Sequence, residues 1–132
     1  MRVRELRAGD LMTDQLVTIA PGETLRAAAQ LMERKHIHCL LVPAQEANRC
    51  LGVLTGKDIV QVLCEGDETL LEQLRVSDVM TAPAISVQQD FLIADCIRLM
   101  RMSGVRSVPV LSGSVPVGVL SFSDVLRAVA QP

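Results

Sequence analysis

The sequence contains an internal repeat that covers most of its 132 residues. Residues 10–13 read Asp-Leu-Met-Thr, and residues 78–81, which lie 68 positions later (10 to 78), read Asp-Val-Met-Thr. Further along, residues 52–55 read Gly-Val-Leu-Thr and residues 118–121 read Gly-Val-Leu-Ser. Repetition at a fixed spacing predicts that one structural unit is built twice. We therefore divide the chain into copy one (8–66), a linker helix (67–75) and copy two (76–132), which together are expected to form one module.

Each copy passes through the same order of hydrophobic patterns. A short β-branched run predicts a strand, apolar positions spaced i, i+3, i+4 and i+7 predict a helix, and two apolar runs followed by a second amphipathic segment predict two strands and a helix. In copy one these segments are 17–19, 25–32, 39–42, 52–54 and a helix from Thr55, with a polar connection at 43–49; in copy two they are 85–87, 93–100, 105–111, 115–120 and a helix from Ser121.

The predicted fold class is thus α/β (α+β), with two pseudo-symmetric β-α-β-β-α copies. A domain of about 55 to 60 residues buries little core on its own. For this reason we expect the two copies to pack sheet to sheet. Gly104 is expected to end the first helix of copy two, because glycine favours the left-handed position after a helix.

Composition narrows the possible functions. The 13 Lys and Arg residues against 15 Asp and Glu residues give a net charge of −2, with basic residues clustered only at Arg2, Arg4 and Arg7. Nucleic-acid binding needs a broad basic surface or stacking aromatics, and aromatic residues make up only 2% of the chain. No apolar run is long enough to span a membrane, the first ten residues are too charged for a signal peptide, and the four cysteines form no C-x-x-C pair. We expect a cytoplasmic protein that contacts neither nucleic acid nor membrane.

No pattern of an enzyme or a metal protein stands out. The chain has no glycine-rich phosphate loop and no nucleophile elbow, so we expect no catalytic activity. His36, His38 and Cys39 are residue types that bind zinc. On a strand, however, successive side chains point to opposite faces, and no fourth ligand is evident. We expect no metal site.

A hydroxyl and a carboxylate three residues apart recur at the start of the last helix of each copy, as Thr55 with Asp58 and as Ser121 with Asp124. One interpretation is a capping box, in which each side chain bonds the backbone of the other residue. The other is a ligand site, since the free N–H groups of a helix start attract anions and a carboxylate accepts from a diol. Both interpretations remain open, because a cap and an anion compete for the same N–H groups.

These motifs, together with Ser107-Val108-Pro109-Val110, resemble in their order and duplication the CBS domain family, named for cystathionine β-synthase. The resemblance implies a tandem pair, or Bateman module, that binds an adenine nucleotide and forms a homodimer. It implies an energy or metabolite sensor for AMP, ADP or ATP, or for S-adenosylmethionine or NAD, with no required cofactor and with a separate effector protein. The alternative is a dimerisation or scaffold module whose clefts are unused.

The resemblance also implies two clefts. In the family pattern Thr or Ser holds the phosphate side, Asp accepts from the ribose hydroxyls, and apolar residues flank adenine. One cleft combines Val119, Ser121 and Asp124 with Val17, Ile37 and His38; the other combines Val53, Thr55 and Asp58 with Ile85, Val105 and Arg106. Because Arg106 is a permanent cation, its cleft is expected to take the more highly charged nucleotide. Copy one departs from the family pattern at Leu41, where copy two has Pro109.

Overall fold

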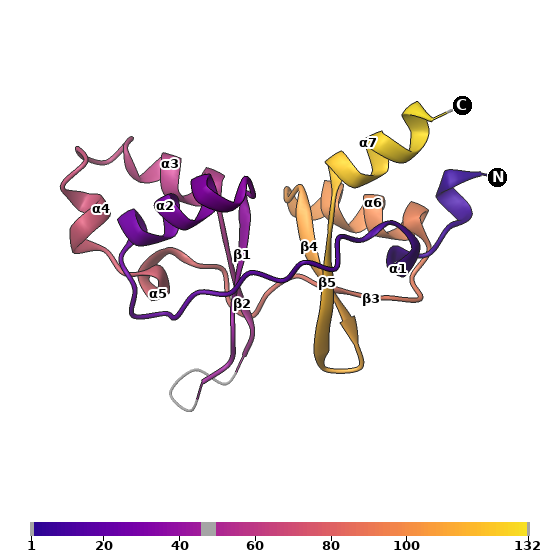
Figure 1. Ribbon diagram of the computed structural model, residues 1–132, viewed down its shortest axis with the longest axis horizontal. Coiled ribbons are helices and arrows are strands. Elements are labelled where there is room, and N and C mark those ends of the chain that lie inside the picture. The colour runs from indigo at the N-terminus through magenta and orange to yellow at the C-terminus, as the bar shows by residue number, and fades with distance from the viewer. Residues whose placement is uncertain (1, 46–49, 132) are drawn as a thin grey trace. The chain divides into compact units, whose positions relative to one another are not determined.

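The chain folds into two compact units whose boundaries differ from those of the sequence copies. The computed structural model describes residues 2–45 and 50–131. The contiguous unit is Val17–Ala84, whereas the split unit joins Met1–Leu16 to Ile85–Pro132. In Figure 1 the indigo N-terminal segment accordingly lies beside the orange and yellow elements of copy two. The Asp-x-Met-Thr segment of each copy therefore belongs to the unit that holds the later elements of the other copy.

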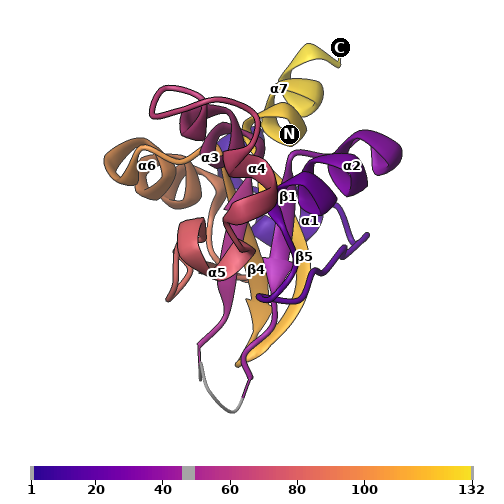
Figure 2. The same ribbon diagram turned by 90° about the vertical axis from the view of Figure 1, so that its left-hand side faces the viewer.

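The contiguous unit is a small sheet covered by helices. Strand β1 (Cys39–Val42) pairs antiparallel with β2 (Gly52–Thr55), and Val42 lies opposite Gly52. Single bridges extend this pair on both sides, from Thr18 to Leu41 and from Thr81 to Val53. The helices are α2 (Leu25–Lys35), α3 (Gly56–Val62), α4 (Leu70–Gln73) and α5 (Val76–Val79). Figure 2 shows α4 and α2 in front of β1.

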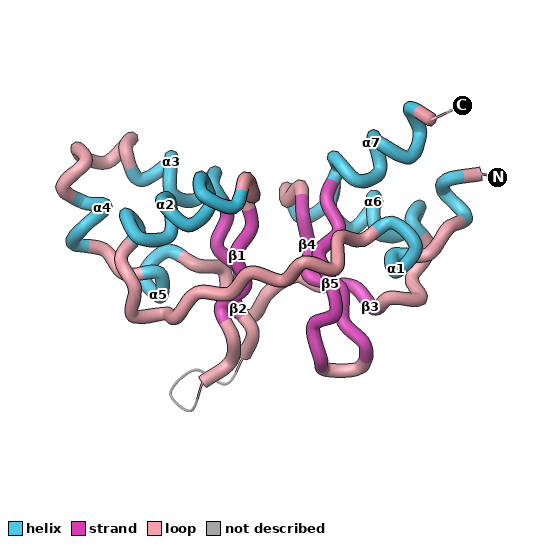
Figure 3. Tube along the Cα trace, viewed as in Figure 1, coloured by secondary structure: helices cyan, strands magenta, loops and turns pink. Residues whose placement is uncertain are grey.

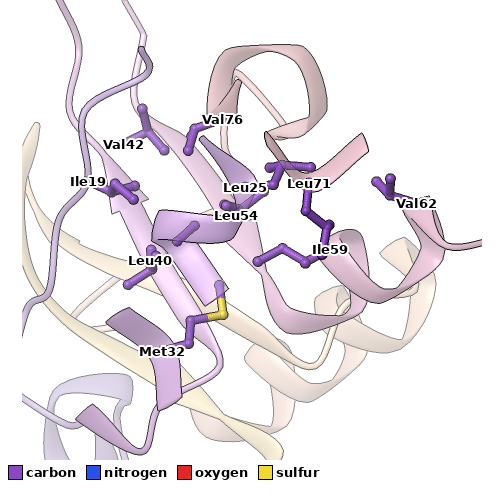
Figure 4. Close-up of a cluster of buried hydrophobic side chains, with 11 residues drawn as sticks. Ile19, Leu25, Met32, Leu40, Val42, Leu54, Ile59, Val62, Leu71 and Val76 are labelled. Carbon is purple, nitrogen blue, oxygen red and sulfur yellow. The ribbon is translucent and has the colours of Figure 1, made fainter. Parts of the chain in front are cut away.

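The core of the contiguous unit lies where the apolar stripe of α2 meets the sheet. Leu25 and Ala28 of α2 are fully buried, as are Leu40 of β1 and Leu54 of β2. Figure 4 shows Leu25, Leu40 and Leu54 among the buried side chains of this core. Helix α2 is capped by Thr24, whose hydroxyl accepts a hydrogen bond from the N–H of Ala27 at 3.1 Å. The periodicity that predicted this helix is thus the pattern that builds the core.

The split unit repeats this plan. Its sheet has the order β3-β4-β5, in which β3 (Val87–Gln88) is parallel to β4 (Ser107–Ser112) and β4 is antiparallel to β5 (Val115–Ser121). Thr13 bridges β5 at Val119, as Thr81 bridges β2 in the contiguous unit. The helices are η1 (Val3–Glu5), α1 (Ala8–Leu11), α6 (Ile93–Ser103) and α7 (Phe122–Ala130).

The N-terminal segment is part of the split unit's structure. Ala8 is fully buried and its N–H donates to the carbonyl of Phe91 at 2.8 Å, while the N–H of Gly9 donates to the carbonyl of Gln89 at 2.9 Å. The backbone of Thr13 exchanges two hydrogen bonds of 2.9 Å with Val119. As a result, residues 8–13 are held by backbone bonds to elements of copy two.

The predicted α+β class is confirmed by the helices and strands of both units. In copy one, the strand predicted over 17–19 is reduced to a single bridge at Thr18. The predicted connection over 43–49 lies partly outside the described residues, which omit 46–49. Figure 3 shows that long loops, residues 12–24 and 80–86, carry the chain from one unit to the other. Within 2–45 and 50–131, no helix is both long enough and apolar enough to cross a membrane.

Candidate functional site

The two Thr/Ser-x-x-Asp loops lie where the last strand of each unit turns into a helix. Thr55 ends β2 and caps α3, and Ser121 ends β5 and caps α7. Both loops form complete capping boxes. The N–H of Thr55 donates to Asp58 Oδ2 at 2.9 Å and the N–H of Asp58 donates to Thr55 Oγ1 at 3.3 Å. The corresponding distances in copy two are 2.8 Å and 3.3 Å. The capping interpretation is therefore confirmed at both loops.

Asp124 is the more heavily engaged of the two carboxylates. Only 6% of this residue is exposed. Its Oδ2 accepts from the N–H of Ser121 at 2.8 Å and from Ser121 Oγ at 3.0 Å. Its Oδ1 accepts from Thr13 Oγ1 at 3.2 Å and from Arg127 Nη1 at 3.2 Å. The sequence reasoning missed Thr13 and Arg127 as partners of this loop.

Asp58 makes fewer contacts although it holds the equivalent position. It is half-buried, and its Oδ2 accepts only the N–H of Thr55. Within 2–45 and 50–131, no hydrogen-bond donor lies within bonding distance of its Oδ1. The residue three positions on is Gln61, where copy two has Arg127. One oxygen of Asp58 is thus available to a ligand hydroxyl, whereas both oxygens of Asp124 are occupied.

His38 and Arg106 are each tied to the loop of their own unit. The carbonyl of His38 accepts from the N–H of Gly56 at 2.9 Å, and the carbonyl of Arg106 accepts from the N–H of Phe122 at 2.9 Å. Both residues are exposed. The structure therefore brings His38 beside the Thr55 loop and Arg106 beside the Ser121 loop.

The remaining predicted residues follow the same division by unit. Val53 is buried, and Val17, Ile37, Ile85, Val105 and Val119 are half-buried. The contiguous unit holds Val17, Ile37, His38, Val53, Thr55 and Asp58; the split unit holds Ile85, Val105, Arg106, Val119, Ser121 and Asp124. The combination of these residues into two clefts stays a prediction.

A small depression of about 160 Å³ lies in the contiguous unit between α2 and α3. Its lining includes Ile37 and His38, and three of its other positions carry smaller residues than copy two has at the equivalent places. These are Ala29, Gly56 and Val60, where copy two has Ile97, Phe122 and Leu126. The smaller side chains of copy one leave open the space beside His38.

Two side chains with other possible chemistry, His36 and Cys96, lie in structural positions. Among the described residues, no group of three or more His, Cys, Asp or Glu side chains is placed to hold a metal ion. His36 follows α2 as its left-handed C-terminal residue. Burial, together with the neighbouring Asp95 carboxylate, raises the pKa of the Cys96 thiol to about 11. At neutral pH this thiol is protonated and forms part of the core of the split unit.

The family is decided by a match to both copies of the repeat. The family model described as "CBS domain" matches residues 8–65 and 76–131. The chain belongs to the CBS domain family. As a CBS pair, it is 28% identical over 116 residues to the CBS domain-containing protein YhcV of Bacillus subtilis (strain 168), spanning 87% of this chain and 79% of that protein. Other curated relatives are longer, and the chain spans 37% and 41% of two of them.

Solved structures of CBS proteins have the same fold. The hexameric CBS-CP12 protein from bloom-forming cyanobacteria matches this CBS pair with a TM-score of 0.84 and 29% identity, over 96% of this chain and 75% of that one. The CBS domain pair of protein MJ0100, solved in complex with 5′-methylthioadenosine and S-adenosyl-L-methionine, matches with a TM-score of 0.79 and 19% identity, over 94% of this chain and 95% of that one. The second likeness shows the fold alone.

Proposed function

We propose that this CBS pair is a regulatory module that binds an adenine nucleotide, or another adenosyl ligand, at its Thr/Ser-x-x-Asp loops. The observation that carries the proposal is the duplicated loop, in which a hydroxyl and a carboxylate meet at a helix start beside His38 or Arg106. A carboxylate accepts two hydroxyls of a ribose, and a cation or imidazole suits a phosphate. The adenosyl ligands in the MJ0100 complex support this ligand class.

Regulation follows if the ligand favours one of two conformations of the module. A ligand shifts such an equilibrium only by its difference in affinity for the two states. The proposed reader of the shift is a separate effector protein, and the proposed assembly is a homodimer. An exposed apolar stripe on α7, formed by Phe122, Leu126 and Val129, supports self-association. Its CBS-CP12 relative is hexameric. We propose a binding role without catalysis and without a required cofactor; the cytoplasmic location stays a prediction.

The second candidate is a scaffold module with no ligand. The two complete capping boxes favour it, because each carboxylate already has a structural role at its helix start. This candidate predicts that nucleotides leave the protein's stability unchanged.

Thermal melting in the presence of AMP, ADP, ATP, NAD or S-adenosylmethionine separates the two candidates. At about 100 times Kd, a ligand adds about 2.7 kcal/mol to the free energy of unfolding, which raises Tm by several degrees. Asp58→Ala and Asp124→Ala should each reduce the rise, measured against the ligand-free Tm of the same variant. No rise with any of the five compounds supports the scaffold, and a rise that survives both substitutions places the ligand elsewhere.

The same experiment tests whether Arg106 binds the phosphates of the nucleotide. If Arg106 faces phosphates, Arg106→Ala should weaken the binding of ATP more than that of AMP, because ATP carries more negative charge. Equal losses for the two nucleotides would contradict a phosphate role for this residue.

A further inference from the structure

We propose that Thr13 is an intramolecular competitor for the carboxylate of Asp124, so that both hydroxyls of a ligand diol reach this carboxylate only when Thr13 releases it. The inference rests on the proposed function and concerns the regulation of one of its two loops. It makes the N-terminal segment the element that controls the copy-two loop. Among the described residues, no threonine hydroxyl donates to the carboxylate of the copy-one loop.

The hydrogen bonds at Asp124 account for all of its acceptor capacity. An ionised carboxylate offers about four lone-pair sites, two on each oxygen. Two of them take the N–H and the hydroxyl of Ser121, and the other two take Thr13 Oγ1 and Arg127 Nη1. A vicinal diol donates two hydrogen bonds and must displace two of these partners.

Thr13 is the partner whose displacement has a structural consequence. The Arg127 side chain is 67% exposed, so its guanidinium can turn to water at little cost. The N–H of Ser121 belongs to the capping box of α7, and the Ser121 hydroxyl is held at the carboxylate because its oxygen also accepts from the N–H of Asp124 in the same box. Thr13, by contrast, bonds to Val119 through its backbone, and it lies two residues after the end of α1, whose Ala8 and Gly9 bond to Phe91 and Gln89. Loss of the bond from Thr13 to Asp124 therefore releases a contact of the N-terminal segment, which is remote from Asp124 in sequence.

Copy one provides the internal comparison. Thr81 makes the same two backbone bonds to Val53, each 2.9 Å, that Thr13 makes to Val119. Among the described residues the Thr81 hydroxyl donates to no carboxylate, and Gln61 replaces Arg127. The two threonines thus share a backbone position but differ in the role of the hydroxyl.

The test is isothermal titration of AMP into chains that carry Asp58→Ala, so that the copy-two loop is the one measured. Thr13→Val keeps the shape of the side chain and removes the donor, Thr13→Ser keeps the donor, and Thr81→Val is the matched control. Because a hydrogen bond to a charged group contributes about 1.5–3 kcal/mol, we expect Thr13→Val to tighten AMP binding by about tenfold or more. Thr13→Ser and Thr81→Val should leave it unchanged.

A merely structural role of Thr13 predicts the opposite sign. If Thr13 only supported the loop, Thr13→Val would weaken AMP binding, and this result, or an unchanged affinity, overturns the inference while AMP binding itself upholds the proposed function. Equal tightening by Thr81→Val overturns it as well. If neither the unsubstituted chain nor any variant binds AMP, ATP or S-adenosylmethionine, the proposed function fails and the inference fails with it.

Discussion

His36 occupies a backbone position that copy two gives to a glycine. Its φ is 56°, and Gly104, which follows α6 at the equivalent position, has a φ of 70°. Left-handed backbone costs a residue with a Cβ roughly 1–2 kcal/mol, and glycine avoids this cost. The position explains His36 as the end of a helix, with no need of a metal or a phosphate.

Substitutions at His36 and Gly104 should change the free energy of unfolding in opposite directions. His36→Gly should raise the free energy of unfolding by about 1 kcal/mol, and Gly104→Ala should lower it by a similar amount. Apart from its chain neighbours, no heavy atom of the described residues lies within 4 Å of a Cβ built on Gly104, so its change is one of backbone conformation alone. Chemical denaturation of the two variants checks both values. A loss of stability in His36→Gly would show that its side chain contributes a contact that outweighs the strain.

At the residue scale, the sequence predicted features set by local backbone geometry but not contacts between distant residues. The end of α6 was predicted from Gly104 because the backbone requirement is local. The partners of Asp124 were not, because Thr13 lies 111 positions away and only the fold brings the two together. The recurrence of a threonine at 13 and 81 was visible in the sequence, but its hydroxyl bonds a carboxylate in just one of the described copies.

At the scale of elements, the glycines of the repeated Gly-Val-Leu motif leave room for the Asp-x-Met-Thr segment. A Cβ on Gly118 of β5 would lie 2.8 Å from the carbonyl oxygen of Thr13 and 2.5 Å from Met12 Sδ. A Cβ on Gly52 of β2 would lie 2.9 Å from Met80 Sδ, which is the flexible end of a side chain. Of these two glycines, Gly118 alone has a backbone atom of the Asp-x-Met-Thr segment close to its added Cβ.

We therefore predict a graded effect of alanine at three glycines. Gly118→Ala should cost about 1–3 kcal/mol, because the segment that contains Thr13 has to move. Gly52→Ala should cost less, since Met80 can change rotamer. Gly22→Ala is the control, because nothing lies within 4 Å of its added Cβ. Urea denaturation of the three variants gives the order, and a loss at Gly22 equal to that at Gly118 would contradict the steric explanation.

The sequence predicted long elements better than short ones. Helices α2 and α6 have 11 residues each, enough for their apolar stripe to be read. Helices α1 and α5 have 4 residues each and were missed, because one turn shows no period. The run at 17–19 was predicted as a strand on its β-branched residues, yet it makes a single bridge, since pairing depends on the partner strand as well as on composition.

At the scale of the whole molecule, the units divide the chain in a way that can be tested by truncation. Deletion of residues 2–13 removes the buried Ala8 and the bridge from Thr13 to Val119 from the split unit. We expect faster amide hydrogen exchange across 85–131 and unchanged exchange across 17–84. Equal acceleration in both ranges would show that the contiguous unit depends on the deleted segment.

The contiguous unit lies in sequence between the two parts of the split unit, and this order affects how the chain folds during synthesis. Val17–Ala84 is complete when residue 84 has been synthesised, whereas residues 1–16 are synthesised before it and their partners in 85–132 after it. Single bridges join Thr18 to Leu41 of β1 and Thr81 to Val53 of β2, and Leu41 pairs with Val53, so Thr18 and Thr81 are separated by three strand spacings, about 14 Å. A finished contiguous unit thus holds the two flanking segments near each other and lowers the entropic cost of closing the loop between them.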